Sequence, residues 1–152
     1  MSGNLRKVLY FDVETTGLDA KLNDIIQLSG IIEIDGEIKE TFNLKMQPFD
    51  WTTISSEALN VTGTTDEMLK SYGTPQKAFS DFIGLLSTYV DRYDKTDKMY
   101  AAGYNVQFDI GFLREFFLKN GDNMTKSNLE YLEEMKKDFP NVEELIANSR
   151  SD

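Results

Sequence analysis

The chain contains no cysteine and no histidine among its 152 residues. Without cysteine, disulfides, thiolate nucleophiles and zinc–thiolate sites are excluded, and nothing indicates an oxidising compartment. Without histidine, Ser-His-Asp triads and imidazole bases are excluded as well. Carboxylates, lysine, tyrosine and hydroxyls remain for chemistry, so any metal ion would be held by oxygen. Oxygen ligands favour Mg²⁺ or Mn²⁺ over copper or zinc, and leave Ca²⁺ open.

Long apolar runs are also missing. The first residues contain no apolar stretch long enough for a secretory signal, and no uninterrupted run approaches the roughly 20 residues of a membrane helix. We therefore expect a cytoplasmic protein with no membrane partner. The length favours a single domain over residues 1–152, large enough to bury its own core.

Basic residues are outnumbered by acidic ones, 16 to 26, which gives a formal net charge of −10. This balance argues against a broad groove that grips nucleic-acid phosphates. A cleft that carries metal ions could still accept a terminal nucleotide, because bound cations would dominate the local field. A generic acidic surface explains the same charge.

The most informative segment is residues 8–17, an apolar run that ends in acids, Val-Leu-Tyr-Phe-Asp-Val-Glu-Thr-Thr-Gly. The run predicts a buried strand, on which Asp12 and Glu14 point to the same side because they are two residues apart. Two like charges in a poorly hydrated place repel, and are usually kept ionised by a cation. We therefore predict a divalent metal site. The alternative is an exposed strand end whose acids cap the following turn.

Two further strands are predicted to extend this one into a meander. Residues 24–34 are rich in isoleucine and leucine, and the Asp-Gly pair at 35–36 is typical of a two-residue hairpin turn. Residues 37–47 alternate between apolar and polar, which predicts a strand with one buried face and one wet face.

Helical signals follow the meander. Residues 55–57 and 64–67 have the composition of helix starts and predict two short helices. A Thr-Pro pair opens a longer helix over residues 74–90, whose apolar stripe is predicted to be core. A charged linker, residues 91–98, leads to a short buried strand at 99–102 beside the first strand. This order indicates an α/β sheet covered by helices on at least one side.

A third acid, Asp109, lies in a predicted helix over residues 106–119. Helical spacing places it on the same stripe as three apolar side chains, so it should face the sheet that carries Asp12 and Glu14. Three carboxylates can then converge. The alternative is that Asp109, early in its helix, only complements the helix dipole, an effect of roughly 0.3–1 kcal/mol.

Two motifs together resemble a known family. Residues 11–17, Phe-Asp-Val-Glu-Thr-Thr-Gly, and 103–109, Gly-Tyr-Asn-Val-Gln-Phe-Asp, resemble the first and second motifs of the DEDD, or DnaQ-like, 3′-5′ exonucleases. This family includes the proofreading subunit of bacterial DNA polymerase III. Residues 54–63 are similar to the stretch between the motifs, with Thr62 where a histidine is often found. The resemblance extends over residues 7–119.

The resemblance implies a ribonuclease H-like fold, with a mixed sheet that begins with the meander and helices packed on it. It also implies release of nucleoside monophosphates from the 3′ end of DNA or RNA by two Mg²⁺ or Mn²⁺ ions, and a DNA polymerase subunit as a protein partner. By resemblance, Asp12 contacts both ions, Glu14 binds the first, and Asp109 binds directly or through water. The substrate-binding candidates are Thr15, Thr16, Gly17 and Asn105, of which Asn105 is alternatively a helix cap.

The family's third motif carries a fourth aspartate and a histidine or tyrosine that activates water, and it is not found here. The sequence has no histidine, and residues 120–152 contain no Tyr-x-x-x-Asp sequence. This part is predicted to be a truncated or altered, divergent tail, with charged helices over residues 129–139 and 142–147. Glu134 and Asp138 are acids in the corresponding region, but a solvated helix face explains them better than a replacement ligand.

Three functions therefore stay open. The first is an exonuclease domain, intact or cut short, and we take it as the working hypothesis. The second is a catalytically silent, exonuclease-like module that binds a polymerase or a nucleic-acid end. The third is a chain with this fold and an unrelated binding role, since fold alone does not decide function.

Overall fold

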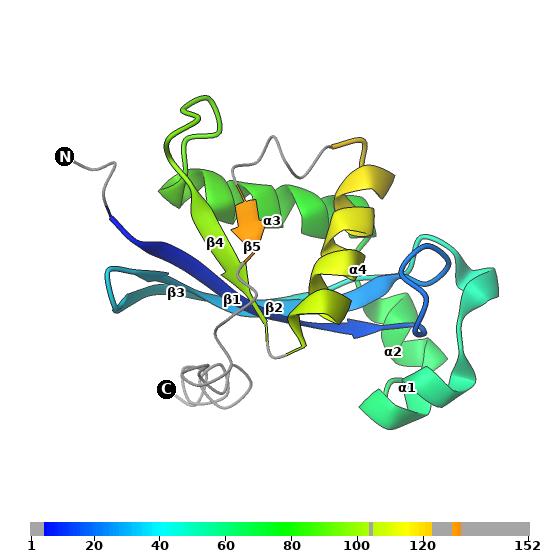
Figure 1. The fold of residues 1–152 in the computed structure, drawn as a ribbon. Coiled ribbons are helices and arrows are strands. Elements are labelled where there is room, and N and C mark those ends of the chain that lie inside the picture. The colour runs from blue at the N-terminus through cyan, green and yellow to red at the C-terminus, as the bar shows by residue number, and fades with distance from the viewer. Residues whose placement is uncertain (1–4, 104, 123–128, 132–152) are drawn as a thin grey trace.

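A five-stranded mixed sheet forms the centre of the molecule (Figure 1). The computed structural model describes residues 5–103, 105–122 and 129–131. The strands lie in the order β3-β2-β1-β4-β5, with β1, β2 and β3 antiparallel, and β4 and β5 parallel to β1. Their bounds are β1 Lys7–Thr15, β2 Ile25–Ile34, β3 Glu37–Lys45, β4 Met99–Ala102 and β5 Leu129–Tyr131.

The predicted meander is confirmed, and its tight turn has the expected chemistry. Asp35 and Gly36 join β2 to β3 with φ angles of 50° and 82°. Positive φ at both central residues defines the turn whose twist matches that of the flanking strands, and Asp-Gly adopts it readily. Arg6 adds a hydrogen bond from its backbone N–H to the Asp35 carboxylate, at 2.8 Å.

The four helices predicted before residue 120 are confirmed as well. They are α1 Ser56–Thr62, α2 Asp66–Ser71, α3 Pro75–Tyr89 and α4 Val106–Lys119, with a short 3₁₀ turn, η2, at Trp51–Thr53. Ser55, Thr65 and Thr74 cap the first three helices, because each side chain accepts a backbone N–H of the first turn. None of the helices described combines the length and the apolar character needed to cross a membrane.

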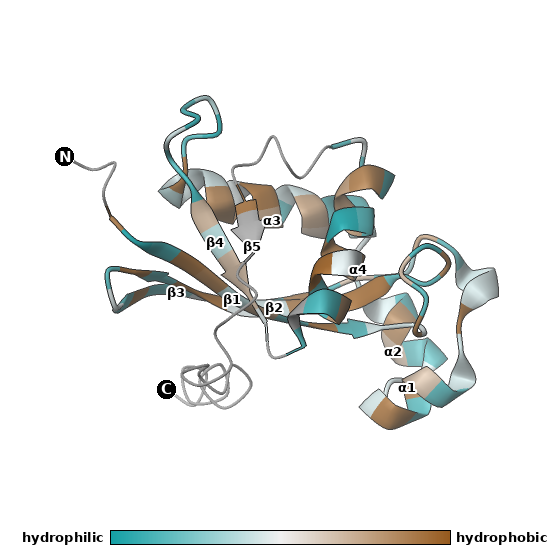
Figure 2. Cartoon of the chain, in the orientation of Figure 1, coloured by the Kyte–Doolittle hydropathy of each residue, from teal (hydrophilic) through white to brown (hydrophobic). Residues whose placement is uncertain are grey.

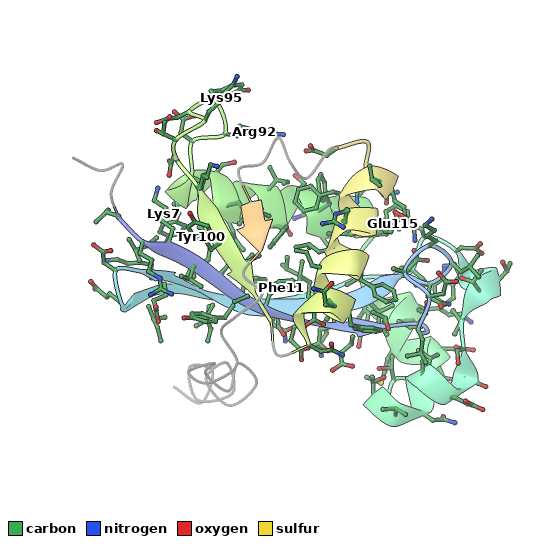
Figure 3. All side chains as sticks on the ribbon, viewed as in Figure 1. Lys7, Phe11, Arg92, Lys95, Tyr100 and Glu115 are labelled. Carbon is green, nitrogen blue, oxygen red and sulfur yellow. The ribbon has the colours of Figure 1, made fainter. Side chains whose placement is uncertain are left out.

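Helices α3 and α4 cover one face of the sheet and pack on each other (Figure 1). Figure 2 shows hydrophobic residues along the central strands and along both helices. The Phe79 ring meets those of Phe116 and Phe117 edge-on, with centroids 5.4 and 5.1 Å apart. Phe11 of β1, labelled in Figure 3, belongs to the same core cluster as the buried phenylalanines of α4. The apolar stripe of α3 is therefore core, as predicted.

Strand β4 determines where α4 begins. It pairs in parallel with the first half of β1, from Val8 opposite Tyr100 to Tyr10 opposite Ala102. Lys7 Nζ anchors the linker before β4 by donating to Asp97 Oδ1 at 2.6 Å. Because β4 ends beside the middle of β1, the chain enters α4 close to the acidic end of β1.

One prediction of secondary structure is wrong. The charge pattern predicts a helix over residues 129–139, but Leu129–Tyr131 form strand β5, with Leu129 opposite Met99 and both side chains buried. Three residues among charged neighbours give no strand pattern in the sequence. The strand forms because pairing with β4 and burial of one leucine outweigh local propensity. The other residues of the two predicted tail helices, including Glu134 and Asp138, lie outside the described residues.

Replacement of Phe117 by alanine tests the packing of α4 on α3. Phe117 is fully buried, and its ring also meets that of Phe82, 6.1 Å away. We expect Phe117→Ala to lower the free energy of unfolding by about 3–5 kcal/mol, measured by urea denaturation. The neighbouring Leu118, 55% exposed, provides the control, for which alanine should cost below about 1 kcal/mol. Equal losses in the two variants would contradict this packing.

Candidate metal centre at the end of strand β1

Asp12 and Glu14 lie on the same face of β1, as predicted. Along residues 11–15 the side chains alternate between buried and partly exposed, and the two acids occupy the partly exposed positions. In the ladder with β2, Asp12 lies opposite Ser29 and Glu14 opposite Gln27. Both acids therefore project from one side of the strand. The buried Val13, which lies between them in the sequence, projects from the other side.

Asp109 is the most unusual acid of the region. It lies in the first turn of α4, is only 2% exposed, and its Oδ2 atom has no hydrogen-bond partner in the part of the chain that the structure describes. A buried carboxyl oxygen without a partner carries a desolvation cost that hydrogen bonds usually offset. Interaction with the helix dipole, worth about 0.3–1 kcal/mol, is too small to account for this position.

The electrostatics of Asp109 connect it with the other two acids. The pKa of the Asp109 carboxyl is raised from 3.8 to about 8, mainly by burial, then by the charge of Asp12 and, to a smaller extent, by that of Glu14. A backbone hydrogen bond with Asn105 opposes these effects and lowers the pKa. Because the charges of both strand acids act on Asp109, the three predicted acids share one neighbourhood.

This neighbourhood is not a finished ligand set. Within residues 5–103, 105–122 and 129–131, no group of three or more Asp, Glu, His or Cys side chains is arranged to hold a metal ion. The chemistry of the acids nevertheless fits a hard divalent cation, which would take up the unpartnered Asp109 oxygen and offset the mutual repulsion of three carboxylates. The metal role of Asp12, Glu14 and Asp109 therefore stays a prediction.

Thr15 and Thr16 shape the loop that follows β1. The Thr15 hydroxyl donates to the Gly17 carbonyl oxygen at 2.7 Å, and the Thr16 hydroxyl accepts the backbone N–H of Asp24 at 2.9 Å. The Thr16 backbone N–H in turn donates to the Asp24 carbonyl oxygen at 2.9 Å. Both side chains are buried, so they hold the loop together. Their predicted contact with a terminal nucleotide is not tested by these bonds.

The structure explains Gly17 by a neighbour within the chain. A Cβ atom at this position would lie 2.3 Å from Asn23 Oδ1. Asn23 cannot easily move, because its Oδ1 accepts the Asp19 N–H at 3.0 Å and its Nδ2 donates to the Thr53 carbonyl oxygen at 2.8 Å. Close approach of a nucleotide is therefore not needed to account for glycine at this position, and the predicted role of Gly17 in substrate binding stays a prediction.

Asp24 is a residue that sequence reasoning missed. Its carboxylate accepts the Lys119 ammonium at 2.7 Å through Oδ1 and the backbone N–H of Asp50 at 3.0 Å through Oδ2. It thereby joins the loop after β1 to the end of α4 and to the start of η2. The only signal in the sequence is an acid directly before an apolar strand, since the partners are 95 and 26 residues away.

Two other predicted positions have modest structural roles. Asn105 occupies the N-cap position of α4, in line with the alternative of a helix cap, but its side chain is exposed and makes no capping hydrogen bond. Thr62, in the place where the family often has histidine, ends α1 and donates to the Leu59 carbonyl oxygen at 3.1 Å. A contact between Asn105 and a nucleotide stays a prediction.

The raised pKa of Asp109 predicts how stability depends on pH. The folded state keeps the proton to about pH 8, whereas the unfolded chain releases it near pH 3.8, so this stabilising contribution is complete below pH 4 and is lost as the pH rises toward 8. An asparagine at this position would have no proton to lose. In EDTA, Asp109→Asn should therefore gain unfolding free energy relative to the wild type between pH 5 and 9, by a few kcal/mol at most.

Urea denaturation at pH 5, 7 and 9 measures this difference. The control is Asp66→Asn, which changes an exposed acid in the first turn of α2 and should shift stability by a nearly constant amount. Parallel pH curves for the wild type and Asp109→Asn would contradict the raised pKa.

The explanation of Gly17 is tested by Gly17→Ala, which should lower the unfolding free energy by about 1–3 kcal/mol because the new methyl group meets Asn23. In an Asn23→Ala background the same change should cost much less. The control is Gly84→Ala in α3, where, apart from the adjacent helix backbone, no atom of the described residues lies within 4 Å of the added Cβ and stability should rise by about 0.5–1 kcal/mol. If Gly17→Ala is neutral in thermal unfolding, the explanation is wrong.

The sequence is similar to known exonuclease domains. The Exonuclease (RNase_T) family model matches residues 9–150. The PolC-type DNA polymerase III of Listeria welshimeri is 34% identical over 124 residues, which cover 79% of this chain and 8% of that protein. The corresponding polymerase of Halalkalibacterium halodurans is 32% identical over 111 residues, or 73% of this chain and 7% of that protein. The chain thus spans less than a tenth of the length of these relatives.

Solved structures agree on the fold. A product-bound structure of exonuclease I superposes with a TM-score of 0.69 at 20% identity, covering 84% of this chain and 29% of that one. Escherichia coli exonuclease I in complex with a dT13 oligonucleotide gives 0.67 at 21% identity, covering 83% and 27%. The family model and the relatives above 30% identity thus confirm the predicted family, and the neighbours confirm the ribonuclease H-like fold. This chain belongs to the Exonuclease (RNase_T) family of DnaQ-like 3′-5′ exonucleases.

Proposed function

We propose that this chain removes nucleoside 5′-monophosphates from the 3′ end of single-stranded nucleic acid. In this reaction water splits the bond between phosphorus and the 3′ oxygen, which leaves a new 3′-hydroxyl on the shortened strand. The observation that carries the proposal is the buried, unpartnered Asp109 oxygen beside the charges of Asp12 and Glu14. Similarity to exonuclease I, one structure of which holds an oligonucleotide, supports single-stranded DNA as the first substrate to test.

Asp12, Glu14 and Asp109 would hold Mg²⁺ or Mn²⁺ in this proposal. Such ions supply an activated water and stabilise the attacking and leaving oxygens of phosphodiester hydrolysis. Asp109 releases its proton when it becomes a ligand, because a cation favours the ionised carboxylate. Asn105 and the loop at residues 15–17 are the proposed neighbours of the terminal nucleotide.

A DNA polymerase is the protein partner that we infer. In the PolC-type relatives, the segment similar to this chain is part of a chain named as DNA polymerase III. A domain that shortens 3′ ends next to a polymerase is suited to removing terminal nucleotides before synthesis continues.

Two observations favour a second candidate, the catalytically silent module. No group of three acids is arranged for a metal in the described residues, and the sequence contains neither histidine nor a Tyr-x-x-x-Asp motif after residue 120. Such a module would bind a strand end or a polymerase without hydrolysis.

Strand shortening separates these candidates. A 5′-labelled single-stranded DNA oligonucleotide incubated with the wild-type chain and Mn²⁺ should yield a ladder that shortens from the 3′ end. Asp12→Ala should slow this shortening at least about 100-fold, because it removes the proposed shared ligand. The matched control Asp66→Ala removes an exposed acid of α2 and should leave the rate unchanged.

The other outcomes are equally clear. Shortening that persists in Asp12→Ala would contradict the proposed site. If a 5′-labelled RNA oligonucleotide is shortened in the same way as the DNA, the chain does not discriminate between the two sugars. Oligonucleotide binding without shortening in any metal would support the silent module. If the chain binds neither Mn²⁺ nor the oligonucleotide, both candidate functions are contradicted.

A further inference from the structure

The charge of the chain limits how it can hold a single strand. With 26 acidic and 16 basic residues, few cations are available to contact phosphates along a strand. The other general source of affinity is stacking of bases on exposed aromatic side chains, worth about 1–3 kcal/mol per base. A strand-binding surface is therefore expected where an exposed aromatic residue lies on a rigid segment near the acids.

Trp51, the single tryptophan of the chain, meets this description. It is 38% exposed and begins the η2 turn. Two consecutive residues of the loop after β1 hold this turn at both ends. Asp24 Oδ2 accepts the backbone N–H of Asp50 at 3.0 Å, and Asn23 Nδ2 donates to the Thr53 carbonyl oxygen at 2.8 Å.

The same turn is connected to the acidic end of β1. The backbone N–H of Ser55 donates to the carbonyl oxygen of Thr16 at 2.7 Å, only two residues after Glu14. The ion pair of Asp24 with Lys119, in which the Asp24 side chain is 1% exposed, fixes the loop to the end of α4. Figure 1 shows the loop between β1 and β2 next to the segment that leads into α1. A platform fixed in this way loses little conformational entropy when it binds.

The loop also presents apolar surface beside this connection. Leu22, directly before Asn23 and Asp24, is 60% exposed. Leu22 and Trp51 are thus exposed apolar side chains on two segments that hydrogen bonds join, and exposed apolar side chains near one another can contact a partner. The planar indole and the leucine methyl groups can contact bases of any sequence.

We propose that Trp51, with Leu22, is a stacking platform for the bases of a single strand whose 3′ end lies at the acids. This inference rests on the proposed function and adds how the strand is held. Base contacts at this platform, and not phosphate contacts, provide most of the affinity for the strand. Binding therefore depends weakly on salt, and it changes the environment of the indole.

Fluorescence of the single tryptophan tests this inference directly. Unlabelled oligo(dT) is added to Asp12→Ala in EDTA, where cleavage is expected to be slowest, while anisotropy of a labelled oligo(dT) measures affinity in parallel. We expect quenched emission and an affinity loss of roughly 5- to 150-fold on Trp51→Ala. Trp51→Phe, which retains a ring, should recover most of the affinity and so exclude a folding defect. The control Tyr93→Ala removes a 91% exposed aromatic side chain elsewhere and should bind as before.

Results that contradict the Trp51 platform can be told apart from results that contradict the exonuclease activity. Oligonucleotide binding with unchanged emission and an unaffected Trp51→Ala variant would overturn the platform, as would an affinity that falls steeply with salt. Failure of the proposed function appears separately, as absence of strand shortening by the wild-type chain. Absence of any binding would overturn both.

Discussion

Repulsion among three carboxyl groups is the constraint on which the candidate site depends. Asp12 and Glu14 project from one side of β1, and their charges act on Asp109, whose burial already disfavours ionisation. The fold holds these groups together nonetheless, because the parallel pairing of β4 with β1 and the aromatic packing of α4 fix the helix start. Packing energy thus maintains an arrangement that electrostatics alone would disperse, and a proton on Asp109 offsets part of the repulsion.

The loop after β1 also helps to fix the position of α4 relative to β1. Asp24 connects this loop with η2 and with the last residue of α4, so both ends of α4 are fixed relative to β1. A partly buried ion pair of this kind gains little net stability from its charges, but it is specific in geometry. The loop, the turn and the helix are therefore held together by specific contacts, which relate the positions of the acids and of Trp51.

Most of the fold could be predicted because its signals are local. The Asp35-Gly36 turn, the Thr74 cap and the stripe of α3 each follow from a few adjacent residues. Strand β5 could not, because three residues become a strand only through pairing with β4. Of the site, the three acids were found from strand and helix periods. Asn23 and Asp24 were missed, since their importance lies in partners that are distant in sequence.

The acidic composition and the clustered acids lead to one physical consequence for the proposed function. A chain of net charge −10 repels phosphates on balance, so a strand is best accepted where cations neutralise the charge locally. Under this proposal the acids that repel one another also define the single place where a phosphate is accepted. Because only the scissile phosphate is attracted, the upstream nucleotides must be held by uncharged contacts with their bases. Such contacts do not distinguish one base sequence from another. An acidic exonuclease domain of this kind would release its shortened product readily, because each phosphate that leaves the metal centre returns to a repulsive field.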